Sequence, residues 1–389
     1  MSQLEVYQEI QDYLGQYLRP GIGKRTLDRL TLLVSGMLKA RHGAPAQIAE
    51  AGKGLSARGA QAESIERRIR RIENDARVQP QTCLEPLVKK LLANSRMEEM
   101  RLIVDPSLQE DRVVLVSINA WYRGRSLPLA WSVWPANRPL EGAGFWQRIA
   151  ELLHRAQQLI PPGVRVTVLA DRAFGTPAFT DLVTGLGWHW IVRVQGQTQG
   201  RDICGRERSL AQRVKARGER AKLAGQVFKK AGWRTASMVV YWGQRYTAPL
   251  CLVSDLPPAW TLIADYRRRF AIEPSFRDWK SYGWRWEQGQ VTNLEHLKRL
   301  LLGMALATWL TLLVGALHAQ SLLAQLASGK RHTRPWAGKK SLFRLGLQLW
   351  FDCFSEGLPP RLAYSLPDWN APNWSTQITA HFAYAFIFA

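Results

Sequence analysis

Apolar positions in the first part of the chain repeat at helical spacing. They do so over residues 4–18 and 27–38, with breaks at Pro20 and Gly43. Apolar residues three and four positions apart line one face of a helix, whereas a half-buried strand would alternate apolar and polar positions. No such alternation occurs here, so the pattern predicts an all-helical N-terminal domain over residues 1–95.

Part of this domain has the spacing of two helices joined by a tight turn. Residues 45–51 and 60–76 are the predicted helices, and a Gly-containing turn at 52–54 lies between them. The second helix is rich in arginine, including Arg67, Arg70 and Arg71. The pattern fits a DNA-binding helix-turn-helix, and it equally fits an ordinary pair of helices whose arginines pair with neighbouring acids. Both interpretations stay open.

The pattern changes to strands from about residue 100. Short β-rich runs, separated by turns and by two helical stretches, give the order β-β-β-α-β-α-β. The predicted strands cover 101–104, 113–122, 126–134, 165–170 and 188–194, and the predicted helices cover 144–159 and 177–185. This order is the skeleton of an RNase H-like mixed sheet, so we predict an α/β catalytic domain over residues 96–320.

A basic segment interrupts this domain at about residues 195–258. Between Arg201 and Arg234 it holds eleven Lys or Arg against three Asp or Glu, and Trp233 and Trp242 lie at and just beyond its end. Strand patterns follow at 237–241 and 249–254. Basic and aromatic residues in this mixture suit a strand-rich insertion, between the fifth core strand and the next helix, that grips a DNA backbone or an unstacked base. The alternative is a solvated loop whose tryptophans belong to the core.

Composition narrows the class of partner. The net charge is +22 and the pI is near 10.3, which favours a polyanion, with nucleic acid ahead of an acidic membrane surface. Four widely spaced cysteines predict free thiols in a cytoplasmic protein. Residues 300–317 carry no charge and just reach the length of a membrane span. We interpret them as a buried core helix and predict no membrane attachment.

Three acids lie where the predicted topology brings distant segments of the chain together. Asp105 follows the first strand, Asp171 follows the fourth, and Glu273 lies on the helix after the insertion. Strands one and four are neighbours in this fold, so the carboxylates are expected to converge at one edge of the sheet. Carboxylate oxygens bind Mg²⁺, and two such ions support phosphoryl transfer.

The helix with Glu273 has a spacing of its own. Tyr266, Arg269, Glu273 and Lys280 follow the pattern Tyr-x2-Arg-x3-Glu-x6-Lys, which places all four within a sector of about 60° on one α-helix. This sector suits metal and phosphate, although a solvated basic helix has a similar composition. Pro274 is expected to start or kink the helix directly after Glu273.

Three stretches carry a resemblance to a known family. They are VDPS (104–107), LADRAF (169–174) and YRRRFAIEPSFRDWKSYGW (266–284). Over roughly residues 25–315 the chain resembles a DDE transposase of the insertion-sequence-four type, a bacterial cut-and-paste family. The resemblance implies that Asp105, Asp171 and Glu273 are catalytic ligands of two Mg²⁺ ions, for which Mn²⁺ would substitute. It also implies phosphate contacts from Tyr266, Arg269 and Lys280, and a base contact from Trp233 or Trp242.

The function implied by this resemblance is DNA transposition. A homodimer on paired ends would bind the terminal inverted repeats, cleave the strands, with or without hairpin ends, and join them to target DNA in the bacterial nucleoid. Two alternatives keep the fold: a catalytically silent DNA-binding descendant, and an RNase H-like nuclease without strand transfer. Residues 321–389 are expected to serve dimerisation or to be irregular.

Overall fold

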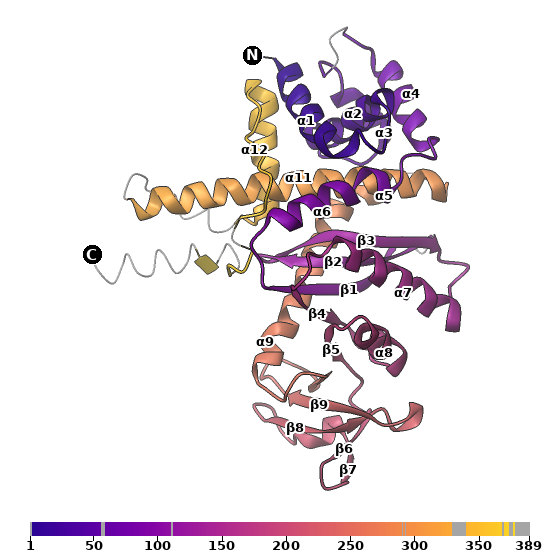
Figure 1. Cartoon of the computed structure of the whole chain (residues 1–389), viewed down its shortest axis with the longest axis vertical. Helices are drawn as coiled ribbons and strands as arrows, with labels where there is room; N and C mark the ends of the chain where they lie inside the picture. Colours follow the sequence, from indigo (N-terminus) through magenta and orange to yellow (C-terminus); the bar gives the residue numbers. More distant parts are fainter. Residues whose placement is uncertain are drawn as a thin grey trace.

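The computed structural model describes residues 2–55, 59–109, 112–289, 291, 293–328, 340–367, 369–372 and 376–377. Its N-terminal part is helical, as the apolar spacing predicted. The helices are α1 (Gln3–Leu18), α2 (Lys24–Ala40), α3 (Pro45–Ala51), α4 (Ala62–Glu73), α5 (Pro80–Cys83) and α6 (Glu85–Asn94). Figure 1 shows α1 to α4 gathered at one end of the molecule. Among the described cysteines all four are free thiols.

A single mixed sheet forms the centre of the molecule. Its first five strands are β1 (Glu99–Gln109), β2 (Val113–Tyr122), β3 (Arg125–Pro135), β4 (Arg165–Ala170) and β5 (His189–Arg193). They lie in the order β3-β2-β1-β4-β5, where β1 to β3 pair antiparallel and β1, β4 and β5 pair parallel. Helix α7 (Gly142–Leu159) connects β3 to β4, and helix α8 (Pro177–Gly185) connects the parallel strands β4 and β5. The predicted α/β fold class and the adjacency of strands one and four are confirmed.

The insertion extends this sheet. It contributes β6 (Gln199–Asp202), β7 (Glu207–Ser209), β8 (Arg220–Val227), β9 (Arg234–Tyr241) and β10 (Leu250–Ser254). Because β10 pairs antiparallel with β5, the ten strands continue without a break as β5-β10-β9-β8-β6-β7. The sequence predicted β9 and β10 only. The other three strands are short or carry charges at exposed positions, which weakens the apolar signal that marks a strand.

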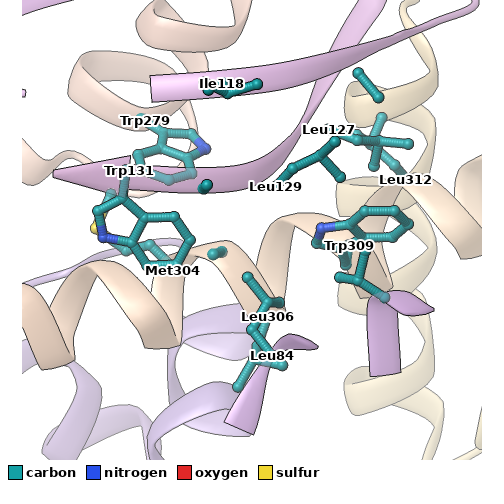
Figure 2. Packing of buried hydrophobic residues seen from close by; sticks show 14 of the residues in the cluster. Leu84, Ile118, Leu127, Leu129, Trp131, Trp279, Met304, Leu306, Trp309 and Leu312 are labelled. Atoms are coloured by element: carbon teal, nitrogen blue, oxygen red, sulfur yellow. The ribbon is translucent and has the colours of Figure 1, made fainter. Parts of the chain in front are cut away.

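Helix α11 (Leu294–Ala327) lies between the N-terminal helices and the sheet (Figure 1). It is long and apolar enough to cross a membrane, but 94% of its most apolar window is buried inside the protein. It contacts α2 on one side and β3 on the other. Figure 2 shows Trp309 and Leu312 of α11 beside Leu127 and Leu129 of β3. The burial confirms the interpretation of residues 300–317 as a core helix.

Several polar groups in this core have hydrogen-bond partners. The Thr308 hydroxyl accepts hydrogen bonds from the indole nitrogens of Trp279 at 3.0 Å and Trp284 at 2.9 Å. It donates to the Met304 carbonyl at 2.7 Å. The Trp309 indole donates to the Pro128 carbonyl of β3 at 2.8 Å. These bonds fix α11 against β3 and against the chain that follows the predicted site helix.

Helix α12 (Leu342–Glu356) crosses α11 at very short range. Two glycines make the crossing possible: a Cβ atom on Gly315 would lie 2.1 Å from the Leu342 carbonyl, and one on Gly346 would lie 1.9 Å from the Thr311 carbonyl. The boundary that we set at residue 320 therefore falls inside α11, and residues 342–356 of the C-terminal region form a regular helix. Residues 329–339 and 378–389 of that region lie outside the described part of the chain.

Candidate active site

Asp105 and Asp171 lie side by side on neighbouring strands. The parallel pairing of β1 with β4 aligns Val104 with Ala170, and each of these residues is followed in sequence by an aspartate. Strand β4 ends there, whereas β1 continues to Gln109 along β2, so Asp105 lies within its strand rather than at the predicted end. The Asp171 carboxylate caps the short helix that follows by accepting the Ala173 amide hydrogen at 2.8 Å. Strand pairing therefore brings two of the three predicted acids together.

The segment that carries Glu273 is helical throughout, but its helix type changes. It comprises α9 (Thr261–Arg267), a 3₁₀ turn at Arg268–Ala271, α10 (Ile272–Arg277) and a π-helical turn at Asp278–Tyr282. Pro274 has no amide hydrogen to donate to the preceding turn, which accounts for part of the irregularity. The predicted single α-helix is therefore wrong in detail, and the side chains are not spaced by a constant 100°.

Arg269 occupies the centre of the acid site. Its Nη1 lies 3.1 Å from Asp105 Oδ1 and its Nη2 lies 3.4 Å from Glu273 Oε1. The Arg269 side chain is only 10% exposed. Burial by itself lowers the pKa of Arg269, but Tyr266 and the surrounding acids outweigh that effect and raise it. One buried cation thus holds an acid of the sheet and an acid of the helix together.

Burial and neighbouring charges also change the pKa of Asp105. Burial raises the pKa of Asp105 to about 6; the charge of Arg269 opposes this rise, and the charges of Asp171 and Glu273 add to it. Desolvation and like charge both disfavour an ionised carboxylate, whereas a nearby cation favours it. Asp105 therefore lies within range of the charges of both other predicted acids.

Their arrangement differs from the expected metal cluster. Within the described residues, no three Asp, Glu, His or Cys side chains are grouped closely enough to hold an ion. The Arg269 guanidinium contacts both Asp105 and Glu273 instead. The donor set itself, three carboxylates, fits Mg²⁺ or Mn²⁺.

Tyr266 lies beneath this cluster and is fully buried. Burial raises its pKa to about 12, and Arg269 and Arg193 partly offset that rise. Although Arg269 is close enough to act on it, neither the Tyr266 hydroxyl nor Arg269 Nε has a hydrogen-bond partner of acceptable geometry in the described structure. Unpaired buried polar groups are rare and costly, and they often mark functional sites.

Lys280 is separated from the acids. Its ammonium donates to the Leu108 carbonyl near the end of β1 and lies 3.6 Å from Glu287 Oε1. The π-helical turn shifts Lys280 away from the sector that uniform helical spacing assigned to it. The structure thus brings Tyr266, Arg269 and Glu273 together and does not bring Lys280 to them.

A second buried ion pair holds the end of this helical segment. Arg125 Nε of β3 donates to Asp278 Oδ2 at 3.0 Å, and both side chains are largely buried. Burial raises the pKa of Asp278 to about 6 despite the opposing charge of Arg125. The sequence did not predict this pair, because the two residues are far apart in the chain and neither belongs to a recognised spacing.

A hollow of about 580 Å³ lies beside Asp171. Its lining includes Arg172, Arg193, Gln195 and Gln197. These residues follow β4 or end β5, so the hollow opens at the same edge of the sheet as the two aspartates. Arginine and amide side chains are suited to phosphate oxygens.

The two insertion tryptophans lie in different settings. The guanidinium of Arg201 lies over the Trp233 ring at 4.6 Å, and Trp242 donates its indole hydrogen to the Tyr246 carbonyl at 3.1 Å. Both rings are half-buried. A third tryptophan, Trp260, directly precedes α9 and was not singled out from the sequence. The signal available was its position next to the Tyr-Arg-Glu-Lys segment.

The α4 arginines that the sequence singled out lie in two kinds of setting. Arg70 pairs with Glu66 at 2.5 Å, as the ordinary helical hairpin predicts. Arg67 and Arg71 are exposed and have no acidic partner among the described residues. Helices α3 and α4 pack together, and α4 also contacts α11. The structure leaves both interpretations of this helix pair open.

Comparison with known proteins gives one sequence family. Residues 118–310, just under half of the chain, match the family described as "Transposase DDE domain". The match includes Asp171 and Glu273, and it begins after Asp105. No curated protein matches the chain.

One similar solved structure is a piggyBac transposase synaptic complex with hairpin DNA, determined by cryo-electron microscopy. It has 10% sequence identity and a TM-score of 0.44, and the match covers 91% of this chain and 78% of that one. A likeness at this TM-score carries no weight for the chemistry or the partners of this chain.

Proposed function

We propose that the protein is a DNA transposase that binds the terminal inverted repeats of its own mobile DNA and cleaves and rejoins strands there. The observation that carries the proposal is the convergence of Asp105, Asp171 and Glu273 around Arg269, inside and beside a segment that matches a transposase DDE domain. A net charge of +22 supports a nucleic-acid partner.

The three carboxylates would hold divalent ions, Mg²⁺ or Mn²⁺, which in such sites activate an attacking oxygen and stabilise the leaving one. Arg269 acts on the same carboxylates when no ion is bound. In the free protein it neutralises Asp105 and Glu273. A DNA phosphate that enters beside it would compete for the guanidinium, since arginine binds phosphate as well as carboxylate in bidentate fashion, and divalent ions bound by the acids would favour that exchange.

Tyr266 would position the phosphate beside Arg269 in this exchange. Its buried hydroxyl lies close to Arg269 and makes no well-formed hydrogen bond in the described structure, so it would donate to a phosphate oxygen that binds next to Arg269. Lys280, whose ammonium lies near the end of β1, would contact a phosphate farther along the same DNA strand. Like Lys280, the exposed Arg67 and Arg71 of α4 are available for DNA backbone contacts that do not depend on sequence.

The test is a cleavage assay on purified protein. Linear duplex DNA with the element's end is incubated with Mg²⁺, with Mn²⁺ or with EDTA, and the products are separated on a denaturing gel. We expect cleavage with either ion and none with EDTA. Asp171→Asn should reduce cleavage at least about 100-fold, since loss of even an outer partner of a metal site costs 10–100-fold.

Asparagine at position 171 keeps the oxygen that accepts the Ala173 amide hydrogen, so the local turn is preserved. The matched control is Asp181→Asn, which removes a half-exposed acid of α8 that pairs with Arg234 at 3.1 Å. It should cleave like the wild type. Normal cleavage by Asp171→Asn would overturn the assignment of the acids.

Two alternatives give different products in the same assay. An RNase H-like nuclease without strand transfer would cut DNA that lacks the element's end, whereas a transposase requires that end and yields joined or hairpin products. A silent descendant would bind the end and leave it intact. We propose further that the active species is a homodimer on paired ends in the cytoplasm. Light scattering of the DNA complex tests the dimer, because two chains should be recovered with two DNA ends.

A further inference from the structure

The insertion carries a second basic cluster on the face of the sheet that α9 covers. The guanidinium of Arg220 lies 4.7 Å from the centre of the Trp260 ring, and the ammonium of Lys222 lies 5.5 Å from it. Trp260 is the N-cap residue directly before α9. Both cations are exposed, and neither pairs with an acid in the part of the chain that the structure describes.

Strand register connects this cluster with the acid site. Arg193 of β5, Leu252 of β10, Val239 of β9 and Lys222 of β8 are successive partners across the sheet. Directly opposed residues share a face, so Lys222 and Arg193 point to the same side. Arg193 lies near enough to Tyr266 to act on its pKa. Cations therefore mark both ends of this row, while the apolar residues between them lie under α9.

We propose that Trp260, Arg220 and Lys222 form a binding site for the DNA backbone, a few base pairs away from the phosphate that is cut. This inference rests on the proposed function and assigns part of the DNA path to this site. The indole ring holds the two cations in place through cation–π attraction, which reduces the side-chain freedom that each would lose on binding a phosphate.

The helix between the two sites sets their separation. Trp260 lies nine residues before Arg269 and thirteen before Glu273 along a nearly continuous helical segment, which at 1.5 Å per residue corresponds to about 14–20 Å. The strand path agrees, since four strand spacings from β4 to β8 cover about 19 Å. Duplex DNA rises about 3.4 Å per base pair, so the cluster should contact phosphates about four to six base pairs from the cut.

The cluster has an internal control. Lys229 and Lys230 are also exposed cations of the same insertion. They lie at the opposite end of β8, because they follow Val227, its last residue, whereas Arg220 is its first. A general loss of basic charge from the insertion would affect both pairs equally, and the proposed path would affect only the cluster at Trp260.

The experiment measures binding of a 40-base-pair duplex that carries the element's end, over a series of salt concentrations. We expect Arg220→Ala/Lys222→Ala to weaken binding about tenfold and to reduce the slope of log affinity against log salt by about 1.8, since each phosphate contact contributes about 0.9. Lys229→Ala/Lys230→Ala, which removes the same charge, should leave the slope unchanged. Trp260→Leu, checked for folding by circular dichroism, should weaken binding less than the double variant.

Location is tested with duplexes whose phosphates are replaced by neutral methylphosphonates. Substitution four to six base pairs from the cut should weaken binding by the wild type and have no further effect on Arg220→Ala/Lys222→Ala. Equal sensitivity of both proteins, or an unchanged salt slope, would overturn the inference. If the wild type neither binds nor cuts the element's end, it is the proposed function that fails, because the inference is judged only on differences from a binding wild type.

Discussion

Thr308 in the middle of α11 and Tyr266 beneath the acid site are both buried hydroxyl side chains, but only Thr308 has hydrogen-bond partners. Thr308 accepts from two indoles and donates to a carbonyl, whereas the Tyr266 hydroxyl has none among the described residues. The same contrast holds for charge. Around α11 the contacts are apolar, while the site gathers acids around one arginine.

The difference between these two hydroxyl groups predicts how each affects stability. A buried polar group without a partner costs about 1–3 kcal/mol, whereas a partnered one loses its bonds only when it is substituted. Removing the Thr308 hydroxyl and removing the Tyr266 hydroxyl should therefore change the free energy of unfolding with opposite signs.

The largest effect is expected where α11 and α12 cross. Gly346→Ala places a methyl group against the Thr311 backbone, which cannot turn aside as a side chain can. The free energy of unfolding should fall by about 3 kcal/mol, as in other overpacked interiors. Urea titration followed by circular dichroism measures it.

The matched control is Gly144→Ala in α7, where an added methyl group meets no atom within 4 Å. It should leave stability unchanged or raise it by up to about 1 kcal/mol, because alanine favours a helix more than glycine does. If both variants lose the same stability, the close crossing of α11 and α12 is not what limits the core.

A smaller loss is expected at Thr308. Thr308→Val keeps the shape of the side chain and removes the acceptor of two indole hydrogens. The free energy of unfolding should fall by about 2 kcal/mol, since two buried donors then lack partners. Fluorescence of the tryptophans during unfolding reports this change. Thr311→Val on the same helix is the comparison, because the Thr311 hydroxyl has no partner in the described structure.

The smallest predicted change is an increase in the free energy of unfolding, not a loss. Tyr266→Phe removes the unpaired hydroxyl and keeps the ring that packs with Leu169, Ile191 and Leu262. The protein should become more stable by about 1 kcal/mol, while cleavage of the element's end should fall about tenfold. A variant that loses both stability and cleavage would show that the hydroxyl has a structural partner, and it would remove the contrast with Thr308.

Much of the fold could be predicted because it depends on local patterns. The helical N-terminal domain, the strand order and the meeting of Asp105 with Asp171 follow from periodicity and from the pairing of strands one and four. The strands of the insertion were partly missed. Lysine and arginine occupy the exposed face of β8, so its apolar alternation is weak even though pairing with β9 makes it a strand.

The close approach of several candidate site residues could be predicted, but their geometry could not. Helical spacing brought Tyr266, Arg269 and Glu273 together, but it also placed Lys280 with them, which the π-helical turn prevents. It could not show that Arg269 would take the place between two acids. That choice depends on side-chain conformation and on the balance of charge in a buried space, which no spacing along one helix encodes.

The position of α11 also has a consequence for synthesis on the ribosome. Strand β3 is complete at Pro135, but the helix that covers its inner face begins at Leu294. About 160 residues must be translated in between, which takes about 10–30 s at typical rates of 5–20 residues per second. During that interval the nascent chain presents an uncovered apolar sheet face. We expect it to engage cellular chaperones, so the amount of active protein should depend on them.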